Sequence, residues 1–283
     1  ISPDSTTKGL VKILSDQTIS IQKLDVVFPV LHGKFGEDGT IQGLLQMSTI
    51  AYVGCDTLAS ASCMDKAVTH TILTNANIKN AKYEIVTVSD ADDNDTVRQR
   101  LEKSLGYPMY IKPANAGSSI GINMVSSAQY LNDAINIALT HDKKVVAEAK
   151  VTGTEVECAV LGNDEPIASC LGEIIPCNDF YDYEAKYISG NSQLIIPAQI
   201  DEDLSLSVQQ IAIKAYKALG CSGLARVDFF VNKETKEIIL NEINTIPGFT
   251  AISMYPKLFA QSGLPYNKLL DTLIDLAIEK NDH

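Results

Sequence analysis

The sequence predicts a multidomain α/β protein whose strands become antiparallel towards the C-terminus. Its 283 residues are enough for two or three domains with sizeable cores. Apolar residues make up 45% of the chain and the mean hydropathy is near zero, a balance typical of a water-soluble globular protein. Segments with helical spacing alternate along the chain with short apolar runs, and this alternation predicts the α/β class.

Short runs of β-branched and other apolar residues, bounded by turn residues, predict the strands. They cover 25–31, 52–54, 84–88, 108–113, 144–148, 154–162, 166–175, 225–230 and 240–248. Apolar spacings of three and four predict the helices. They cover 40–50, 64–77, 96–105, 128–139, 202–219 and 266–279. Residues 1–24 are expected to form a polar linker with a short hairpin, and residues 176–193 an irregular segment rich in aromatics.

The last two strands form a predicted hairpin with polar residues at positions that are costly to bury. Residues two apart share a face of a strand, so Arg226 and Asp228 point one way, as do Glu242 and Asn244. If the hairpin is centred on Thr235, Asp228 lies opposite Glu242, and Arg226 opposite Asn244. Two opposed carboxylates repel each other, which indicates a cation between them. Asp228, Glu242 and Asn244 offer hard oxygen ligands suited to magnesium.

The charge balance of the chain excludes some classes of partner. The formal net charge is −12 and the isoelectric point is about 4.8, which argues against a nucleic-acid groove with its basic face. No apolar run approaches the length of a membrane span, so no membrane partner is expected. None of the six cysteines forms a C-x-x-C motif, which favours reduced, buried thiols in a cytosolic protein.

A loop of small residues follows the predicted strand 108–113. Lys112 stands near the end of that strand, and Gly117, Ser118 and Ser119 come shortly after it. Small residues let backbone N–H groups approach a phosphate, and a lysine adds positive charge. Taken alone, the loop is explained equally well as a tight hairpin turn.

Three further segments have both a functional and a structural explanation. Glu148 ends a strand and Glu155 follows soon after; a carboxylate there can bind an adenine amino group or ribose hydroxyls, although a surface glutamate is the commoner case. The segment 180–187 interleaves four aromatics with charges, so it could close over a site, or simply pack on the core. The glycine-rich segment 32–39 links a strand to a helix, where ligands often bind, or forms a turn with capping acids.

Together these features indicate ATP chemistry without a P-loop, and they form a recognisable set of motifs. In chain order the motifs are H-G-x-x-G-E-D-G at 32–39, M-D-K at 64–66, K-P at 112–113 with G-S-S-x-G at 117–121, F-Y-D-Y-x-x-K-Y at 180–187, R-x-D at 226–228 and E-x-N-x-x-P-G-F-T at 242–250. The set resembles the D-alanine–D-alanine ligase family of the ATP-grasp superfamily, over nearly all of the chain from Asp25 on. The run 244–250 is most similar to the vancomycin-resistance ligases.

The resemblance implies an ATP-grasp fold, in which ATP is held between two α+β domains. The expected divisions are an incomplete N-terminal substrate-binding domain (1–55), a central ATP-grasp subdomain (56–149) and a C-terminal ATP-grasp and catalytic domain (150–283) with an ω-loop at 176–193. Family members begin with a strand and a glycine- and serine-rich loop that carries a glutamate. Nothing before Asp25 matches that start, so we expect the N-terminal α/β domain to be truncated.

The resemblance also implies a two-step reaction that uses ATP and two magnesium ions, with manganese as a substitute. The carboxylate of a first D-alanine attacks the γ-phosphate of ATP to give an acyl phosphate. The amine of a second D-amino acid then attacks the carbonyl carbon, and phosphate leaves. Phosphoryl transfer asks a protein mainly for positioning and charge stabilisation, and a lid is needed because acyl phosphates hydrolyse.

Residues that match the family motifs take roles from the resemblance. The metal ligands would be Asp228, Glu242 and Asn244. The nucleotide would be held by Lys66, Lys112, Ser118, Ser119, Glu148, Val151, Glu155 and Phe180. The catalytic set would be Arg226 and the Gly248 amide, which stabilise negative charge, Tyr187, which orients Ser118, Lys186, and His32 near the first substrate. The second substrate would lie against Ser253, Met254 and Phe249, with its carboxylate bound by Ser253, Met254 and Lys186.

The second substrate is expected to be D-serine, with D-alanine as the alternative. Members that make the ester D-alanyl-D-lactate lack the Lys186–Tyr187 pair, so Tyr187 favours an amine nucleophile. Resistance ligases with this loop usually take D-serine. The segment 251–254 departs from the usual S-H-S-L or S-H-S-R, which bears on the polarity of this subsite.

Two other functions remain open at this point. One is a different ATP-grasp carboxylate–amine ligase, which the motifs at 32–39 and 186–187 disfavour. The other is a nucleotide-binding module without catalysis, which the complete set Asp228, Glu242 and Asn244 disfavours. The resemblance further implies a cytoplasmic homodimer that makes a dipeptide precursor of the cell wall.

Overall fold

The computed structural model describes residues 1–90, 93–175 and 193–282. The strands are β1 Gly9–Ile13, β2 Ile19–Lys23, β3 Val26–Val27, β4 Ala51–Tyr52, β5 Tyr83–Thr87, β6 Met109–Pro113, β7 Asn123–Val125, β8 Lys144–Ala149, β9 Thr154–Gly162, β10 Ile167–Ile175, β11 Gln193–Ile195, β12 Gly223–Val231 and β13 Ile238–Asn244. The helices are α1 Thr40–Met47, α2 Thr57–Met64, α3 Lys66–Asn75, α4 Asn94–Ser104, the 3₁₀ turn η2 Ala128–Tyr130, α5 Leu131–His141, α7 Glu202–Ala218, α8 Met254–Gln261 and α9 Tyr266–Asn281. Phe180, Lys186 and Tyr187 lie outside the described residues.

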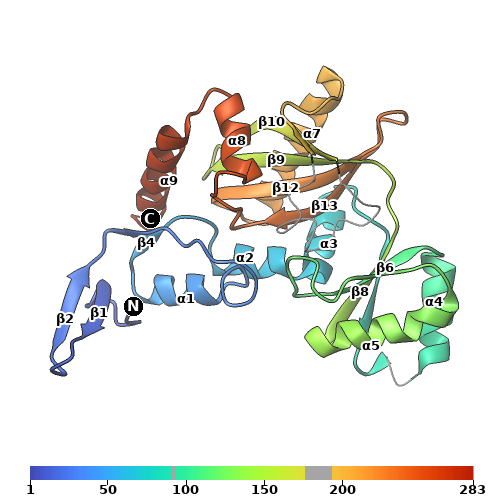
Figure 1. Ribbon diagram of the computed structural model, residues 1–283, viewed down its shortest axis with the longest axis horizontal. Helices are drawn as coiled ribbons and strands as arrows, with labels where there is room; N and C mark the ends of the chain where they lie inside the picture. The colour runs from blue at the N-terminus through green and yellow to red at the C-terminus, as the bar shows by residue number, and fades with distance from the viewer. Residues whose placement is uncertain (91–92, 176–192, 283) are drawn as a thin grey trace.

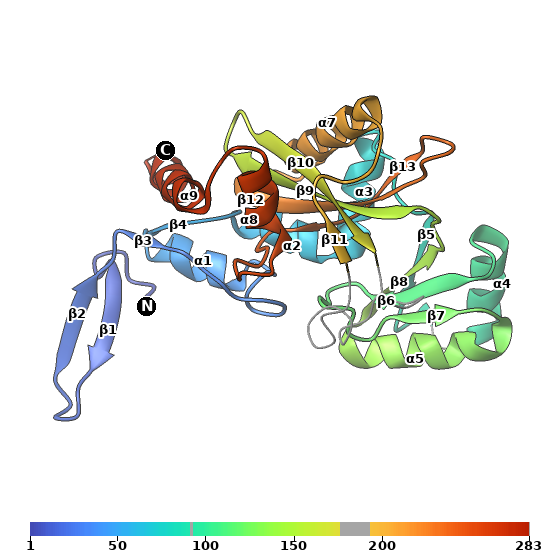
Figure 2. The ribbon, with the colours of Figure 1, turned by 45° about the horizontal axis from the view of Figure 1, so that its top comes forward.

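Two antiparallel sheets carry most of the fold. The larger sheet has the strand order β11-β10-β9-β12-β13, and the smaller has the order β5-β8-β6-β7. The two sheets form separate layers, with α4 and α5 packed against the smaller one (Figures 1 and 2). The β1–β2 hairpin projects from the rest of the molecule, and β3 pairs in parallel with β4. The predicted α/β alternation and the antiparallel C-terminal strands are therefore confirmed.

Two helices of the structure, α2 and α8, are absent from the helices expected from the sequence, for identifiable reasons. The helix expected over 64–77 is confirmed as α3, which begins at Lys66 because the Asp65 side chain caps it by accepting hydrogen bonds from the backbone N–H groups of Ala67 (3.0 Å) and Val68 (3.1 Å). The small residues of α2 give little apolar periodicity, so that helix leaves no clear pattern. Helix α8 has Pro256 in its first turn, which disguises it in the sequence.

One face of the larger sheet is apolar along its whole length. Val156, Val227, Phe229 and Leu240 on this face are fully buried against α2, α3 and α7. The other face changes character along β9 and β12. Leu161 and Leu224 pack there under α8 and α9, whereas charged residues follow further along the same two strands. The part of this face that carries Glu157, Asp228 and Glu242, here called the polar half-face, is therefore open towards the smaller sheet.

A bulge in the β12–β13 hairpin determines which residues of β13 face the apolar core and which face the polar side. Asp228 pairs with Glu242, but the next residue, Phe229, pairs with Leu240, so Asn241 is an extra residue on β13. Leu240 and Ile243 consequently both lie in the apolar core, although they are three positions apart.

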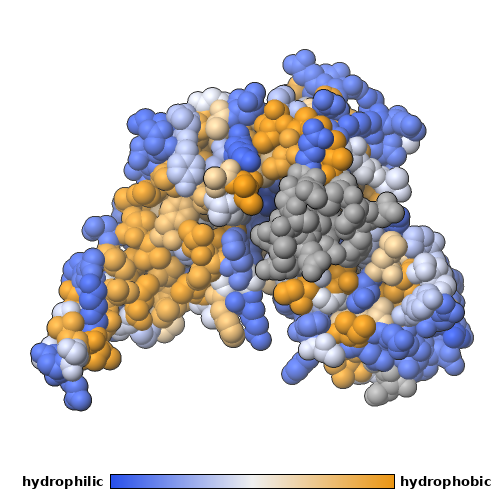
Figure 3. All heavy atoms as spheres, viewed as in Figure 1, coloured by the Kyte–Doolittle hydropathy of each residue, from blue (hydrophilic) through white to orange (hydrophobic). Residues whose placement is uncertain are grey.

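The face of the molecule shown in Figure 3 carries a broad apolar area. In Figure 3 apolar residues gather over α1 and the short strands β3 and β4, beside the projecting hairpin. Exposed side chains near these elements include Val30, Leu31 and Met47. Among the described helices, none is long and apolar enough to cross a membrane.

Candidate active site

Of two adjoining cavities, the larger lies between the two large sheets, and the smaller lies between β13, the helices α2 and α3 and the loops at 32–37 and 116–118. Among the described residues, the larger cavity has a volume of about 560 Å³, and its walls come from both sheets. Its polar lining includes Tyr110, Lys112, Ser119, Glu148, Glu155, Glu173 and Glu242, and Val151 also lines it. The smaller cavity, of about 80 Å³, is lined by His32, Glu37, Lys66, His70, Ser118, Glu242 and Asn244. Glu242 lines both, so it marks the point where the cavities meet.

Three carboxylates stand in a row across the polar half-face. Asp228 on β12 pairs with Glu242 on β13 on one side and with Glu157 on β9 on the other. Arg226 pairs with Asn244, so the register predicted for the hairpin is confirmed at both positions. Asp228 is 2% exposed, so this row concentrates negative charge where water screens it little.

Arg226 neutralises part of this charge. Its Nε and one terminal nitrogen donate to the two oxygens of Asp228, at 2.8 and 2.7 Å, and Nε lies 3.2 Å from Glu157 Oε2. Burial would lower the pKa of Arg226, but Asp228 and Glu157 outweigh burial and hold that pKa above its usual value. One arginine serves two carboxylates, and Glu242 adds a third negative group.

The donor set fits a magnesium ion. Asp228, Glu242 and Asn244 offer only oxygen ligands, and a carboxylate has about four lone-pair sites, so Asp228 can bind a metal and Arg226 together. No group of three histidine, cysteine or acidic side chains among the described residues forms a ready-made metal cage. A site of two carboxylates and one amide would need phosphate and water oxygens to complete it, as magnesium sites at nucleotides commonly do.

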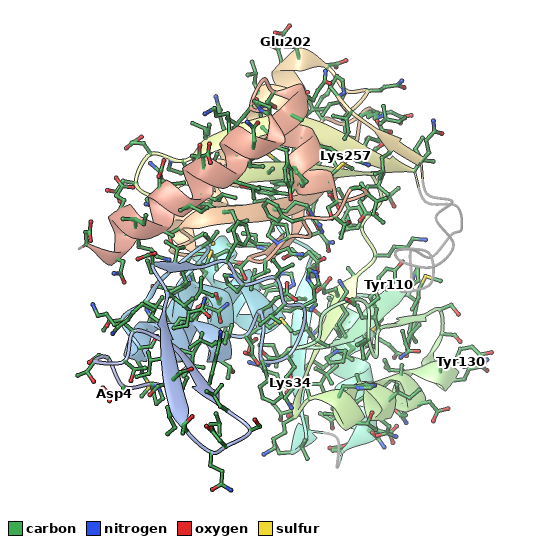
Figure 4. All side chains as sticks on the ribbon, turned by 60° about the vertical axis from the view of Figure 1, so that its left-hand side comes forward. Asp4, Lys34, Tyr110, Tyr130, Glu202 and Lys257 are labelled. Atoms are coloured by element: carbon green, nitrogen blue, oxygen red, sulfur yellow. The ribbon has the colours of Figure 1, made fainter. Side chains whose placement is uncertain are left out.

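Lys112 and Glu148 meet on the side of the smaller sheet that faces the larger cavity. The Lys112 ammonium donates to Glu148 Oε2 at 2.6 Å, and Lys112 also lies 5.9 Å from the ring centre of Tyr110, which Figure 4 labels on this sheet. His70 Nε2 is 3.0 Å from the other oxygen, Glu148 Oε1. Burial alone would raise the pKa of Glu148, but Lys112 and His70 outweigh it and lower the pKa to about 2.

The lowered pKa of Glu148 predicts a pH-dependent stability difference. Because the unfolded carboxyl titrates near 4.5, the contribution is complete above that pH and is lost as the pH falls towards 2. Glu148→Gln is expected to lower the free energy of unfolding by about 3 kcal/mol at pH 7, from about 1.4 kcal/mol per pKa unit. At pH 3 the gap between wild type and variant should shrink to less than half. Urea unfolding at both pH values measures this, and an equal gap at both would contradict it.

The loop after β6 has the left-handed backbone that phosphate-binding loops often use. Ser118 and Ser119 have φ angles of 52° and 59°, and Gly121 has φ of 71°. Ser119 lines the larger cavity and Ser118 the smaller, so the loop spans both. A Cβ on Gly121 would lie 2.9 Å from the Pro113 ring and 2.5 Å from the His141 ring. The loop conformation therefore depends on glycine at 121.

Gly121→Ala is expected to lower the free energy of unfolding by about 1–2 kcal/mol, through the positive φ and the contact with Pro113. It should also weaken nucleotide binding, because the loop must move. Gly106→Ala is the matched control: Gly106 has the same φ of 71°, but a Cβ added there would have no neighbour within 4 Å. Calorimetry with an ATP analogue should show weaker binding only in Gly121→Ala. Equal binding in both variants would show that this loop does not contribute to nucleotide binding.

The smaller cavity collects residues from the N-terminal half. Lys66 is the first residue of α3, and its ammonium donates to the carbonyl of Ala116 at 2.7 Å, next to the small-residue loop. His32 is exposed at the cavity wall. Glu37 accepts a hydrogen bond from the Gly33 N–H. Burial raises the pKa of Glu37 to about 7, and Glu242 acts in the same direction against the Gly33 hydrogen bond.

The segment expected at the second substrate lies apart from both cavities among the described residues. Ser253 directly precedes α8 without a side-chain cap hydrogen bond to it, and its Oγ instead accepts from the Thr250 N–H at 2.9 Å. Met254 is 5% exposed and packs in the apolar core, so only its backbone N–H could reach a substrate. Phe249 packs edge-on against Phe28 at 5.2 Å. A Cβ on Gly248 would lie 2.6 Å from Ser253 Oγ.

Two residues that the structure places at the site lie outside the sequence motifs, and a third, Glu37, lies inside one without having been given a role. Glu157 comes two positions after Glu155 on β9, so strand alternation could have indicated it. His70 comes four positions after Lys66, which puts both on one side of a helix. Glu37 lies inside the motif at 32–39, where its acidic side chain is explained equally well by turn capping.

Comparisons with known proteins agree with this geometry. Residues 72–275 match the family described as D-ala D-ala ligase C-terminus, and residues 4–55 match the family described as D-ala D-ala ligase N-terminus. The similarity therefore begins earlier than Asp25, where the sequence motifs place its start.

Individual relatives and structures show the same likeness. The chain is 53% identical over 259 residues to a D-alanine–D-alanine ligase from Chloroherpeton thalassium, covering 91% of this chain and 71% of that protein. It is 49% identical over 282 residues to one from Caldicellulosiruptor bescii, covering 99% and 77%. A crystal structure of VanG D-Ala:D-Ser ligase from Enterococcus faecalis superposes with a TM-score of 0.88 at 43% identity, covering 98% of this chain and 78% of that one. The structure of the D-alanine–D-alanine ligase from Coxiella burnetii gives 0.83 at 39% identity, covering 93% and 70%. The predicted ATP-grasp fold is thereby confirmed.

Proposed function

The chain belongs to the D-alanine–D-alanine ligase family, and on that premise we propose that it joins D-alanine to a second D-alanine in an ATP-dependent reaction. The observation that carries the proposal is the row of acids that ends at Glu242, where the two cavities meet. A nucleotide in the larger cavity would place its phosphates between Lys112 and this row. A small amino acid in the smaller cavity would then lie beside the terminal phosphate.

The chain's residues would act mainly by positioning and by charge. Lys112 and Lys66 approach the cavities from two sides and would bind phosphate oxygens, with the 118–119 loop beside them. Glu148, Val151 and Glu155 would hold adenine and ribose, together with Phe180. Magnesium, when bound by Asp228, Glu242 and Asn244, would supply charge neutralisation at the phosphate oxygens; one or two ions, or manganese, would serve.

The second half of the reaction would take place on the side of Arg226 and the start of α8. Arg226 and the Gly248 amide would stabilise the negative charge on the carbonyl oxygen during attack by the second amine. His32 would lie near the first D-alanine. Ser253 Oγ and the Met254 N–H would bind the carboxylate of the second amino acid, with Phe249 beneath. Lys186 and Tyr187 would complete the site, with Tyr187 orienting Ser118.

D-alanine replaces D-serine as the favoured second substrate. The sequence motifs favour D-serine, whereas the two relatives described above, at 53% and 49% identity, are named D-alanine–D-alanine ligases. The similarity to a D-Ala:D-Ser ligase structure supports D-serine as the second candidate. A serine hydroxymethyl needs an added hydrogen-bond partner, and the buried Met254 side chain supplies none.

The test is ADP release with magnesium, ATP and D-alanine, with and without D-serine, with the dipeptide products identified by mass. D-alanyl-D-alanine as the main product would support the proposal. D-alanyl-D-serine as the main product when both amino acids are present would replace it with the D-serine candidate. ATP binding without any amino-acid-dependent ADP would overturn both and favour a nucleotide-binding module.

We also propose the setting that the family suggests, a cytoplasmic homodimer that makes a peptidoglycan precursor. The apolar area over α1, β3 and β4 supports self-association, because exposed apolar surface of this kind commonly marks an interface. Light scattering after size exclusion would test the dimer. The division into domains at 1–55, 56–149 and 150–283 is proposed on the same basis.

A further inference from the structure

We propose that His70 is a positioning residue of the nucleotide site, which holds Glu148 so that Lys112 can leave that carboxylate for a phosphate. The proposal rests on the proposed function in one respect, since it places a nucleotide in the larger cavity. In this proposal His70 does not contact the nucleotide or the reacting atoms. The residue would act through Glu148 and Lys112.

His70 is fixed on all sides. It lies on α3, is 3% exposed, and its ring stacks on Tyr83 of β5 with ring centres 4.4 Å apart. Its Nε2 is 3.0 Å from Glu148 Oε1 on β8, and its Nδ1 is 3.0 Å from Asn80 Oδ1. The ring therefore joins α3 to the smaller sheet at the point where Glu148 stands.

The hydrogen bonds of Asn80 decide which groups donate. The Asn80 amide nitrogen donates to the carbonyl of Ile78 at 3.1 Å and to Thr74 Oγ1 at 3.2 Å. A carbonyl can only accept, so the amide oxygen of Asn80 must face His70, and His70 Nδ1 must donate to it. His70 Nε2 faces a carboxylate oxygen that Lys112 already holds ionised by a contact at 2.6 Å. Both ring nitrogens thus face acceptors, an arrangement satisfied when both carry a proton.

Glu148 consequently has two cationic partners, one of which can leave. If Lys112 turned to a phosphate with no His70 present, a carboxylate that is 5% exposed would lose its remaining cationic partner. An uncompensated buried charge is strongly unfavourable, so nucleotide binding would be weakened by that cost. With His70 in place, Glu148 stays paired on Oε1 while Oε2 is released. The cluster also keeps one positive charge in excess, facing an anionic ligand.

The same contacts reach the strand that carries Glu242. Asn80 forms a parallel bridge with Leu240 of β13, and the Leu240 N–H donates to the carbonyl of Lys79 at 2.9 Å. Leu240 is two residues before Glu242. The lysine of the nucleotide cavity is therefore linked to the strand of the acidic row by three side-chain contacts, from Lys112 to Glu148, from Glu148 to His70 and from His70 to Asn80, and by one backbone bridge.

The test compares His70→Phe, which keeps a flat ring against Tyr83 but loses both hydrogen bonds, with His70→Gln, whose amide can still donate to Glu148. His70→Phe is expected to weaken binding of a non-hydrolysable ATP analogue about 10-fold in calorimetry, and to raise the KM for ATP by a similar factor with the KM for D-alanine unchanged. His70→Gln should recover binding to within about threefold of wild type. Asn75→Ala, an exposed change on the same helix, is the control and should match wild type.

A second readout covers the case in which His70→Phe does not fold. Nitrogen-15 NMR of the wild-type imidazole should show a proton on each ring nitrogen of His70, one facing Asn80 Oδ1 and one facing Glu148 Oε1. Unchanged analogue affinity in folded His70→Phe, or a ring nitrogen of His70 without a proton, would overturn the inference. If His70→Phe weakens the analogue while wild type makes no dipeptide, the ligase proposal fails and the inference stands.

Discussion

Asp228→Asn is expected to reduce D-alanine-dependent ADP release by at least about 100-fold, the scale seen when a group that stabilises transition-state charge is removed. The substitution keeps the shape of the side chain and removes one negative charge from the metal ligands. The magnesium concentration needed for half-maximal rate should rise at the same time. Asp164→Asn provides the matched control, because Asp164 is exposed and lies outside both cavities.

The fold should survive this change. Arg226 keeps Glu157 as a partner at 3.2 Å, and the asparagine oxygen can still accept one of its N–H groups. Circular dichroism and urea unfolding would confirm an intact fold before kinetics are compared. Normal turnover at ordinary magnesium in Asp228→Asn would remove Asp228 from the metal site.

Arg226→Met should be the most damaging single substitution, because it acts on both stability and rate. It removes the guanidinium that neutralises Glu157, Asp228 and Glu242, which stand next to one another across three strands. Losing one partner of a buried ion pair costs about 3–5 kcal/mol of folding stability. Loss of charge stabilisation should lower the rate by about 100-fold or more. Urea unfolding and ADP release measure the two effects separately.

A double variant separates the two roles of Arg226. Adding Glu157→Gln to Arg226→Met removes one of the repelling charges, so part of the lost stability should return. The rate should stay low, because no group replaces the guanidinium. If the double variant regained the rate together with the stability, Arg226 would have only a structural role. Arg226→Lys should fall between wild type and Arg226→Met, since an ammonium cannot contact both Asp228 oxygens in the guanidinium's planar geometry.

The acidic hairpin could be predicted from the sequence because strand alternation is a local rule. Arg226 and Asp228 needed only the two-residue period of a strand, and the polar turn fixed the register. The site residues Glu157, His70 and Glu37 depend instead on contacts between segments far apart in the chain. No local pattern indicates that β9 lies beside β12, or that α3 lies against β8. The contacts of these site residues therefore became known only with the three-dimensional structure.

The local errors have the same origin. A helix of small residues such as α2 forms because it is buried against the larger sheet, where Ala59 and Cys63 pack in the core. Its own sequence gives a weak signal. The apolar run 25–31 predicts a strand longer than β3. The strand in the structure has two residues, because only Val26 and Val27 pair with β4. Tertiary contacts decided both cases against local propensity.

The bulge at Asn241 reconciles the spacing of Leu240 and Glu242 with the opposite faces that these two residues occupy. Leu240 and Glu242 are two apart, and in an unbroken strand they would point to the same side. The extra residue divides β13 into two halves of opposite parity, one that delivers leucine to the core and one that delivers glutamate to the cavities. Gains or losses of residues in the 232–237 turn would only change a loop. The loss of Asn241 would make Leu240 and Glu242 adjacent, so regular alternation would still send the leucine to the core opposite Phe229 and the glutamate to the cavities opposite Asp228. Deletion of the bulge residue should therefore leave both faces of β13 as they are.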